Sequence, residues 1–209
     1  MPQSTDKRGG RYHAPRRVEQ AAATKTAIIE AASRLFAENG YAATTVAAIA
    51  AEARVTAKSV YTLADKSRLL LLAVDRAIVG DDEPIPFAER PERQGIIDAA
   101  SGDRLRLAAE LGARSLLRLF PIYRAFEQAA ATDPVVHQRW RDYQQRRRQD
   151  VQALVTDIGA DSGAVDNVWA LVTWHPVALL VEEHGYGEPE LIAWLEKLLA
   201  ALLPVTPDR

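Results

Sequence analysis

The sequence lacks cysteine altogether, which removes several kinds of site at once. Disulfide bonds, thiolate metal centres and cysteine nucleophiles are excluded. A long apolar run is also missing, since no stretch approaches the roughly 18 uninterrupted apolar residues of a membrane-spanning helix. The first 25 residues are basic and polar and do not resemble a signal peptide. We therefore expect a soluble, cytoplasmic protein without membrane contact, associated with the nucleoid if it binds DNA.

Recognisable catalytic motifs are missing too. The sequence has no glycine-rich phosphate loop and no readable Ser/His/Asp arrangement. His137, His175 and His184 have no partner at metal-ligand spacing. We expect no enzyme activity, no metal site and no cofactor.

Charge is unevenly distributed along the chain. The net charge is −2, but residues 1–79 hold 12 Lys and Arg against 7 Asp and Glu, a net charge of +5. The remaining residues carry a net charge of −7. A basic N-terminal third on an acidic body is typical of a protein whose N-terminal part contacts nucleic acid, although ordinary fluctuation of charge is the simpler explanation.

Apolar residues recur with a helical period and nowhere with a strand period, so we predict an all-α protein. Predicted helices cover residues 18–39, 46–53, 57–63 and 66–79, and after an irregular stretch at 80–102 they cover 103–120, 122–131 and 134–158, followed by 164–172, 176–184 and 189–203. Asn39-Gly40 is a helix stop, and Asp133-Pro134 is a cap followed by a proline at the first helical position. The predicted domains are a disordered basic tail at 1–18, a DNA-binding domain at 19–66, and a helical ligand-binding and dimerisation domain at 67–209.

The short helices at 46–53 and 57–63 have the pattern of a helix-turn-helix, whose second helix enters the major groove of DNA. Ala50 is the small residue that lets the helices cross, Arg54 stands in the turn, and Val60 fills the crossing. Hydroxyl and amine side chains on the outward face of the second helix suit phosphate and base-edge contacts. The candidate DNA-binding residues are Thr44, Thr45, Arg54, Thr56, Lys58, Ser59, Tyr61, Thr62 and Lys66. The alternative for Thr44, Thr45 and Thr56 is that they are only helix caps, although capping and phosphate contact are compatible.

Several runs in this region carry a family resemblance, namely Ile28-Ile29-Glu30-Ala31-Ala32, Leu35-Phe36-Ala37-Glu38-Asn39-Gly40-Tyr41, Thr44-Thr45-Val46, Ile49-Ala50 and Val60-Tyr61. On them, residues 28–79 resemble the DNA-binding domain of the TetR/AcrR family of bacterial transcriptional regulators. The resemblance implies a three-helix DNA-binding domain. It also implies phosphate contacts by Thr45, Tyr61 and Lys66.

The chain departs from the family pattern at two places. Arg54 stands where the family usually has glycine, so it either adopts the left-handed conformation at a cost of roughly 1 kcal/mol or more, sits in a reshaped turn, or is recruited to a phosphate. The segment between Tyr61 and Lys66 lacks the usual phenylalanine and is one residue short. We expect Leu63 to take that core position.

The C-terminal part holds most of the aromatic residues, which we interpret mainly as core. In similar regulators a ligand cavity lies between such helices, so the candidate ligand-binding residues are Phe120, Tyr123, Phe126, Trp140, Tyr143 and Trp174, with Glu127 and His175 as candidate polar anchors. We interpret the run Arg146-Arg147-Arg148 as surface ion pairing. Residues 166–204 also resemble the family's dimerisation helices, which gives the candidate interface Leu179, Leu180, Leu191, Trp194, Leu195 and Leu198.

The sequence therefore predicts a sequence-specific DNA-binding transcriptional regulator of the TetR family, with repression as the family's usual mode. Its predicted partners are double-stranded DNA with a near-palindromic operator, an unidentified small-molecule effector and a second copy of the chain. The alternative is a helical ligand-binding or scaffold protein of the same fold that has lost specific DNA binding. An enzyme built on the helical cavity is the third and weakest reading, because no set of catalytic groups is visible.

Overall fold

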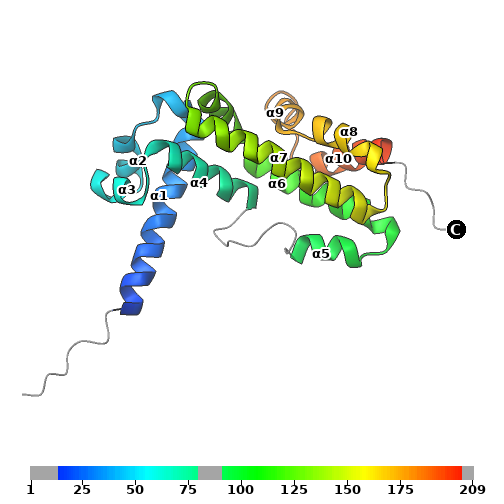
Figure 1. Cartoon of the computed structure of the whole chain (residues 1–209), viewed down its shortest axis with the longest axis horizontal. Helices are drawn as coiled ribbons and strands as arrows, with labels where there is room; N and C mark the ends of the chain where they lie inside the picture. Colours follow the sequence, from blue (N-terminus) through cyan, green and yellow to red (C-terminus); the bar gives the residue numbers. More distant parts are fainter. Residues whose placement is uncertain (1–13, 80–90, 204–209) are drawn as a thin grey trace, which may run out of the picture.

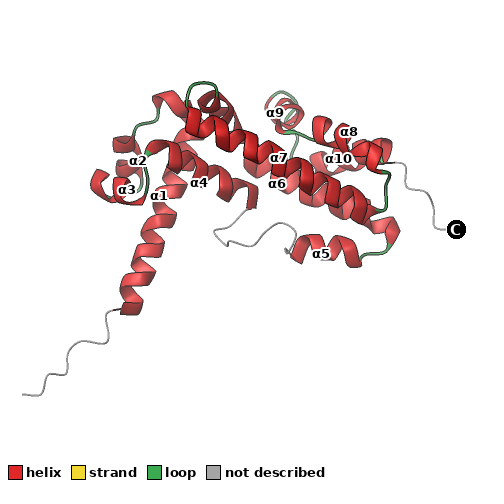
Figure 2. Ribbon diagram, in the orientation of Figure 1, coloured by secondary structure: helices red, strands yellow, loops and turns green. Residues whose placement is uncertain are grey.

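A computed structural model describes residues 14–79 and 91–203. Every regular element in these two ranges is a helix, which confirms the all-α prediction (Figure 2). Helices α1–α4 form one end of the molecule, which we call the head, and the later helices form an elongated body (Figure 1).

The head follows the predicted helices closely. Its elements are α1 (Ala14–Ala43), α2 (Val46–Glu52), α3 (Ala57–Leu63) and α4 (Lys66–Val79). Gly40 interrupts α1 with a φ of 75°, the left-handed conformation that glycine adopts without steric cost, so the predicted stop is confirmed. Helix α1 begins at Ala14, inside the predicted disordered tail, whose residues 1–13 lie outside the described ranges.

Helix α1 is amphipathic only over its second half. Ile28, Ala31, Ala32 and Phe36 are buried at the predicted helical spacing. Its earlier turns are exposed at residues 18–23 and project away from the rest of the head (Figure 1).

The body is organised around two long helices, α6 (Ser101–Ala130) and α7 (Pro134–Ile158), which pack against each other. The shorter elements are α5 (Pro91–Asp98), the 3-10 helix η2 (Ser162–Ala164), α8 (Val165–Leu171), α9 (Trp174–Glu182) and α10 (Glu188–Leu202). Helix α6 contacts the head through α1 and α4 and the C-terminal end through α9 and α10. It is the element that joins the two parts of the molecule.

The prediction of two helices at 103–120 and 122–131 is wrong, because α6 runs through Pro121 without a break. A proline inside a helix lacks the N–H for the bond to the carbonyl four residues earlier, and that loss favours a break. Here Ile122, Tyr123, Ala125 and Phe126 continue the buried face of the preceding turns, whereas Pro121 itself is exposed. Burial of that face outweighs one missing hydrogen bond.

The predicted start of α7 is confirmed in detail. Asp133 is the N-cap, and its Oδ1 accepts hydrogen bonds from the backbone N–H groups of Val135 (2.9 Å) and Val136 (3.3 Å). Pro134 follows at the first helical position, where the missing N–H costs nothing.

One buried apolar cluster runs from the head into the body. It contains Phe36, Ile49 and Val60 of the head together with Phe126 and Tyr143 of the body. A second cluster joins α6, α7, α8, α9 and α10 at the far end of the body. The head is therefore packed on the body through a shared core to which α6 contributes.

Candidate functional site

The two short helices of the head are held at a close crossing. Ala50 in α2 is 4% exposed and Val60 in α3 is fully buried, as the helix-turn-helix pattern predicts. Thr45 caps α2 by accepting a hydrogen bond from the Ala48 N–H (3.1 Å), and Thr56 caps α3 by accepting from the Ser59 N–H (3.1 Å). Both threonines remain exposed, so capping leaves them at the surface where each short helix begins.

The turn between these helices contains a strained residue. Arg54 has a φ of +55° and is the sole non-glycine residue of the described ranges with positive φ. Its N–H donates to the Ala51 carbonyl (3.1 Å), and the Val55 N–H donates to the Ala50 carbonyl (2.9 Å). This bonding pattern is a left-handed helix C-cap, a position that favours glycine. Of the conformations left open by the sequence, the left-handed one is therefore adopted.

Helix α3 presents a polar face to solvent. Lys58, Tyr61 and Thr62 are exposed, and the tyrosine ring is 64% exposed, unusual for so large a side chain. The Thr62 hydroxyl donates back to the Lys58 carbonyl (2.8 Å), and Ser59 is half-buried with its hydroxyl 2.9 Å from that of Thr56. The arrangement offers an amine, hydroxyls and one aromatic ring along a single helix face.

Thr44 has to be withdrawn from the candidate DNA-binding residues. Its side chain is 2% exposed, and its hydroxyl lies 2.9 Å from the Leu35 carbonyl oxygen and 2.8 Å from that of Gly40. The hydroxyl satisfies backbone carbonyls at the end of α1, where the helix stops at glycine.

Lys66 opens α4 as predicted, yet it is half-buried against α1. Its Nζ donates to the Ala42 carbonyl (3.3 Å) and lies 4.4 Å from the centroid of the Tyr41 ring. Burial lowers the pKa of its ammonium group. Leu63 packs against the head core, as expected for the position where the family's phenylalanine is missing.

Sequence reasoning missed a hydrogen-bonded triad between head and body, which we call the Tyr41–Ser67–Asp133 triad. The Ser67 hydroxyl donates to Asp133 Oδ2 (2.6 Å), the Tyr41 hydroxyl lies 3.1 Å from the same oxygen, and the two hydroxyls are 2.9 Å apart. The Ser67 hydrogen bond is the main reason that the pKa of Asp133 is lowered. Burial raises the pKa of Tyr41. Because the partners are 66 and 92 residues apart, no local pattern could have indicated them.

The structure brings most of the predicted aromatic residues together between α6, α7 and α9. Tyr123 is at the centre, with its ring centroid 5.9 Å from Phe126, 5.7 Å from Tyr143 and 5.1 Å from Trp174. Burial raises the pKa of Tyr123 to about 12 and also raises that of Tyr143. Phe120 and Trp140 are partly buried against the same apolar cluster. We call Tyr123, Phe126, Trp140, Tyr143 and Trp174 the aromatic cluster.

The candidate polar anchors and the arginine run lie around this cluster. His175 Nε2 is 3.7 Å from Glu127 Oε2, and the histidine is exposed. Arg148 forms the expected surface ion pair with Asp166 (2.8 Å). Arg147 instead turns inward and donates to the backbone carbonyls of Trp169 and Val172.

Two of the candidate dimer-interface residues face the chain's own core. Leu191 and Leu195 are fully buried on α10, in the apolar cluster that includes α6. They cannot contact a second copy in this conformation, so their assignment to the interface is wrong. Leu179 on α9 is 62% exposed, while Leu180, Trp194 and Leu198 are half-buried.

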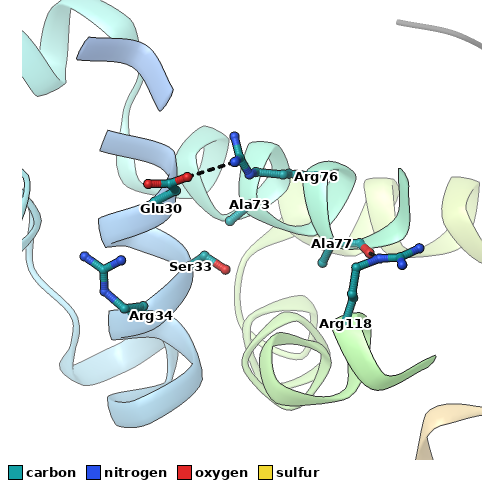
Figure 3. Close-up of a pocket in the computed structure, with 7 residues that line it drawn as sticks. All are labelled: Glu30, Ser33, Arg34, Ala73, Arg76, Ala77 and Arg118. Carbon is teal, nitrogen blue, oxygen red and sulfur yellow. Dashed lines mark hydrogen bonds and ion pairs between the residues drawn. The ribbon is translucent and has the colours of Figure 1, made fainter. Parts of the chain in front are cut away.

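A groove marks the junction of head and body (Figure 3). It has a volume of about 290 Å³ and is lined by Glu30, Ser33, Arg34, Ala73, Arg76, Ala77 and Arg118. Arg76 of α4 pairs with Glu30 of α1 (2.8 Å), and Arg118 of α6 donates to the Ala77 carbonyl of α4 (3.4 Å). Three helices are thus tied together at this junction by polar contacts that lie at the surface.

Metal-ligand groups and membrane-spanning helices can be assessed for the residues that the structure describes. Within residues 14–79 and 91–203, no three His, Cys, Asp or Glu side chains gather as a metal would require. No single helix of these ranges is long and apolar enough to cross a membrane, although the bent pair Ser162–Leu171 and Trp174–Glu182 meets the length and composition criteria.

Comparison with known proteins gives one sequence match and several fold matches. Residues 28–65 match the family model described as bacterial regulatory proteins, tetR family. No curated protein sequence matches the chain.

Three solved structures resemble the whole fold. A candidate TetR-family transcriptional regulator from Mesorhizobium loti MAFF303099 is 20% identical, with 88% of this chain and 97% of that chain covered at a TM-score of 0.66. A transcriptional regulator from Rhodococcus sp. Rha1 is 16% identical, with 87% of this chain and 98% of that chain covered at a TM-score of 0.59. The multidrug binding protein EbrR, complexed with imidazole, is 21% identical, with 98% of this chain and 100% of that chain covered at a TM-score of 0.56. Residues 28–65 of the head thus match the tetR family of bacterial regulatory proteins, and the fold of the described chain is like that of these solved structures.

Proposed function

We propose that the chain is a sequence-specific DNA-binding regulator of transcription, acting as a repressor, whose operator affinity is tuned by a small molecule. The observation that carries the proposal is the exposed polar face of α3, with Lys58, Tyr61 and Thr62, on a helix-turn-helix held by the buried contact of Ala50 and Val60. Helix α3 is the element that would enter the major groove. The mechanism requires no bond to be made or broken.

The proposed contacts divide into two kinds. Lys58, Ser59 and Thr62 are on the α3 face that would meet base edges and phosphates, whereas Thr45 and Thr56 are at helix starts, where N–H groups and hydroxyls suit phosphate oxygens. Tyr61 and Arg54 extend this surface at the two ends of α3. Lys66 stays in the proposal as a phosphate contact that would have to exchange its bond to the Ala42 carbonyl.

The proposed functional unit is a homodimer. Two-fold symmetry would present two copies of α3 about 34 Å apart, one turn of B-DNA, so the operator would be a near-palindrome. Exposed Leu179 supports an interface built on α9, with Leu180, Trp194 and Leu198 beside it. In the proposed domain organisation, residues 19–66 bind DNA, and residues 67–209 bind the effector and the second copy.

The proposed route from effector to operator uses the shared core. The apolar cluster that contains Phe36 and Val60 also contains Tyr123, Phe126 and Tyr143, and the Tyr41–Ser67–Asp133 triad ties the start of α7 to the head. A ligand that binds more tightly to one arrangement of head and body shifts operator affinity by that difference in binding free energy.

The alternative function is a ligand-binding or scaffold protein without sequence-specific DNA binding. Two observations favour it: the strained Arg54 in the turn, and the engagement of Lys66 within the head. Both concern the part of the surface that departs from the family pattern.

The test is selection of binding sites from random duplex DNA by the purified full chain at about 150 mM salt, where exposed charges are screened beyond about 8 Å. An enriched inverted repeat with half-sites about one turn apart is the expected result. The matched control is a Lys58→Ala/Tyr61→Ala variant, which changes only exposed side chains and should fold but select nothing. Failure of the folded, dimeric wild-type chain to enrich any motif would favour the alternative.

A further inference from the structure

The aromatic cluster contains polar atoms that have no partner inside the protein. The buried indole nitrogens of Trp174 and of Trp169 nearby make no hydrogen bond, and neither does Gln144 Oε1. The indole N–H of Trp140 is different, because it is close enough to the Tyr123 hydroxyl to lower the pKa of Tyr123 as a hydrogen-bond donor. Buried polar atoms in native proteins almost always have a partner, and an unmet one lowers stability. Several such atoms next to one ring system therefore call for an explanation.

Tyr123 lies next to two of the side chains that carry these unmet atoms, Gln144 and Trp174. Gln144 Nε2 is 3.1 Å from the Tyr123 hydroxyl oxygen, and Gln144 lies four residues after Trp140 on α7. The Trp174 ring centroid is 5.1 Å from that of Tyr123. Since the two ends of an amide are assigned from their hydrogen bonds, the Gln144 amide can be exchanged so that its oxygen accepts from Tyr123. The unmet atoms are then all N–H donors.

Arg147 adds a positive charge without a matching carboxylate. Its guanidinium donates to the carbonyls of Trp169 and Val172 and lies 5.4 Å from the Trp169 ring centroid. Among the described residues, no carboxylate is within ion-pairing distance of it. Desolvation by burial lowers the pKa of this half-buried arginine.

Carboxylates near the cluster are at its edge. Glu127, which is close enough to raise the pKa of Tyr123 in addition to burial, is occupied with His175 at 3.7 Å. Asp150, which acts on Tyr143, is exposed as a whole residue, but burial of its carboxyl group raises its pKa against the opposing effect of Arg146 and Arg93. The interior is therefore rich in donors and poor in acceptors.

We propose that the aromatic cluster is the effector site and that it takes an aromatic carboxylate. The aromatic ring of the ligand packs on Tyr123 and Trp174, and its carboxylate oxygens accept hydrogen bonds from the indole N–H groups and the Gln144 amide, with Arg147 supplying the nearest positive charge. This inference rests on the proposed function, because it assigns chemistry to the effector of that regulator.

Room for the ligand comes from a shift of Trp174. The rings are in mutual contact in this conformation, and Trp174 is the first residue of α9, which follows a break in the helical chain at residues 172–173. The N-cap Thr173 makes no side-chain capping bond, so the start of α9 is weakly held. Trp174 itself is buried, but the next residue, His175, is exposed, so the start of α9 lies close to the surface.

The test is calorimetric titration of the full-length dimer with 2-naphthoate and with the matched cation 2-naphthylmethylammonium. We expect the carboxylate to bind at least ten-fold more tightly than the cation. Trp174→Phe keeps an aromatic ring but deletes the unmet N–H, so it should weaken naphthoate binding about ten-fold, the value of one hydrogen bond to a charged group. Tyr186→Phe, between α9 and α10 and outside the cluster, also deletes a polar hydrogen from an aromatic side chain; it is the control and should leave binding unchanged.

A second readout separates a ligand role from a merely structural one. If the Trp174 N–H is unmet, Trp174→Phe should lower the melting temperature of the ligand-free protein only by the cost of the smaller buried ring, while it weakens naphthoate binding. A lower melting temperature with unchanged naphthoate binding would overturn the assignment of this donor. Preference for the cation, or binding of neither probe, would overturn the inference as a whole.

Operator binding is measured separately, by fluorescence anisotropy on the selected DNA site. Naphthoate binding that changes operator affinity supports both proposals. Naphthoate binding with no effect on a working operator complex supports the ligand class but refutes the regulatory link. If the ligand-free wild-type protein does not bind DNA specifically, the proposed function is refuted. The calorimetric titration then tests the ligand class independently.

Discussion

Replacing Arg54 with glycine should stabilise the protein. Arg54 has a φ of +55°, and an L-residue in this conformation costs roughly 1–2 kcal/mol because its Cβ crowds the following carbonyl oxygen. Glycine removes that cost but loses about 0.5–1 kcal/mol through the greater freedom of the unfolded chain. We therefore expect Arg54→Gly to raise the free energy of unfolding by about 0.5–1 kcal/mol, or the melting temperature by about 1–4 °C for a chain of this length.

Arg54→Ala is the matched control for the backbone effect. Alanine removes the guanidinium as glycine does, but it keeps the Cβ that causes the strain. Urea unfolding followed by circular dichroism should therefore rank glycine above alanine by about 1 kcal/mol at a fixed protein concentration, since dimerisation contributes to stability. An alanine variant as stable as the glycine variant would refute the strain argument.

The same two variants report whether Arg54 touches DNA. If the guanidinium neutralises one phosphate, both variants lose it, and the slope of log affinity against log salt becomes smaller by about 0.9. A more stable protein with weaker DNA binding would indicate that the strained turn is retained for function. An unchanged salt slope in both variants would remove Arg54 from the proposed contacts.

Three further predictions follow from the geometry. Tyr61→Ala should weaken operator binding measured by fluorescence anisotropy without changing the dimer or the melting temperature, because the ring is 64% exposed; unaltered affinity would exclude it as a contact. Ser67→Ala should destabilise the protein by roughly 1–2 kcal/mol near neutral pH, where its bond to the Asp133 carboxylate is formed. The fold lowers the pKa of Asp133 below 3.8, so this contribution is present above that pH and lost as the pH falls further; a penalty that persists in full at pH 2 would contradict the argument. Leu179→Glu should produce a folded monomer in sedimentation experiments, whereas Leu191→Ala should lower stability by about 2–5 kcal/mol as a core cavity; the reverse pattern would show that α10 rather than α9 meets the second copy.

Helix ends were determined by the sequence because their causes are local. Gly40 stops α1 through its own backbone freedom, Thr56 caps α3 with a bond three residues away, and Asp133 caps α7 across two and three residues. Each signal acts within about one helical turn, so neighbouring residues are sufficient to predict it. The helix-turn-helix also belongs here, since Ala50 and Val60 meet across a turn of only a few residues.

Tertiary structure decided which side of each helix faces the chain's own core and which side faces solvent or a second copy. Leu191 and Leu195 are part of an apolar stripe that suits a subunit interface as well as a core, and only the packing of α10 on α6 assigns them to the core. Thr44 is a surface cap by its pattern but is buried by the return of the chain onto α1. Pro121 breaks a helix by its local chemistry, yet the buried face of α6 carries the helix through it.

The choice of conformation at Arg54 and the contacts of Asp133 depended on the fold in the same way. The residue type at position 54 allowed several turns, and the close crossing of α2 and α3 selected the left-handed one. The sequence predicted Asp133 as an N-cap, but its hydrogen bonds to Ser67 and Tyr41 join segments that are far apart in the chain. Sequence alone determined the helix ends that are set by a cap or a glycine, because capping is local. The fold decided which residues become interior, and whether α6 continues past Pro121, because burial depends on partners that only the folded chain brings together.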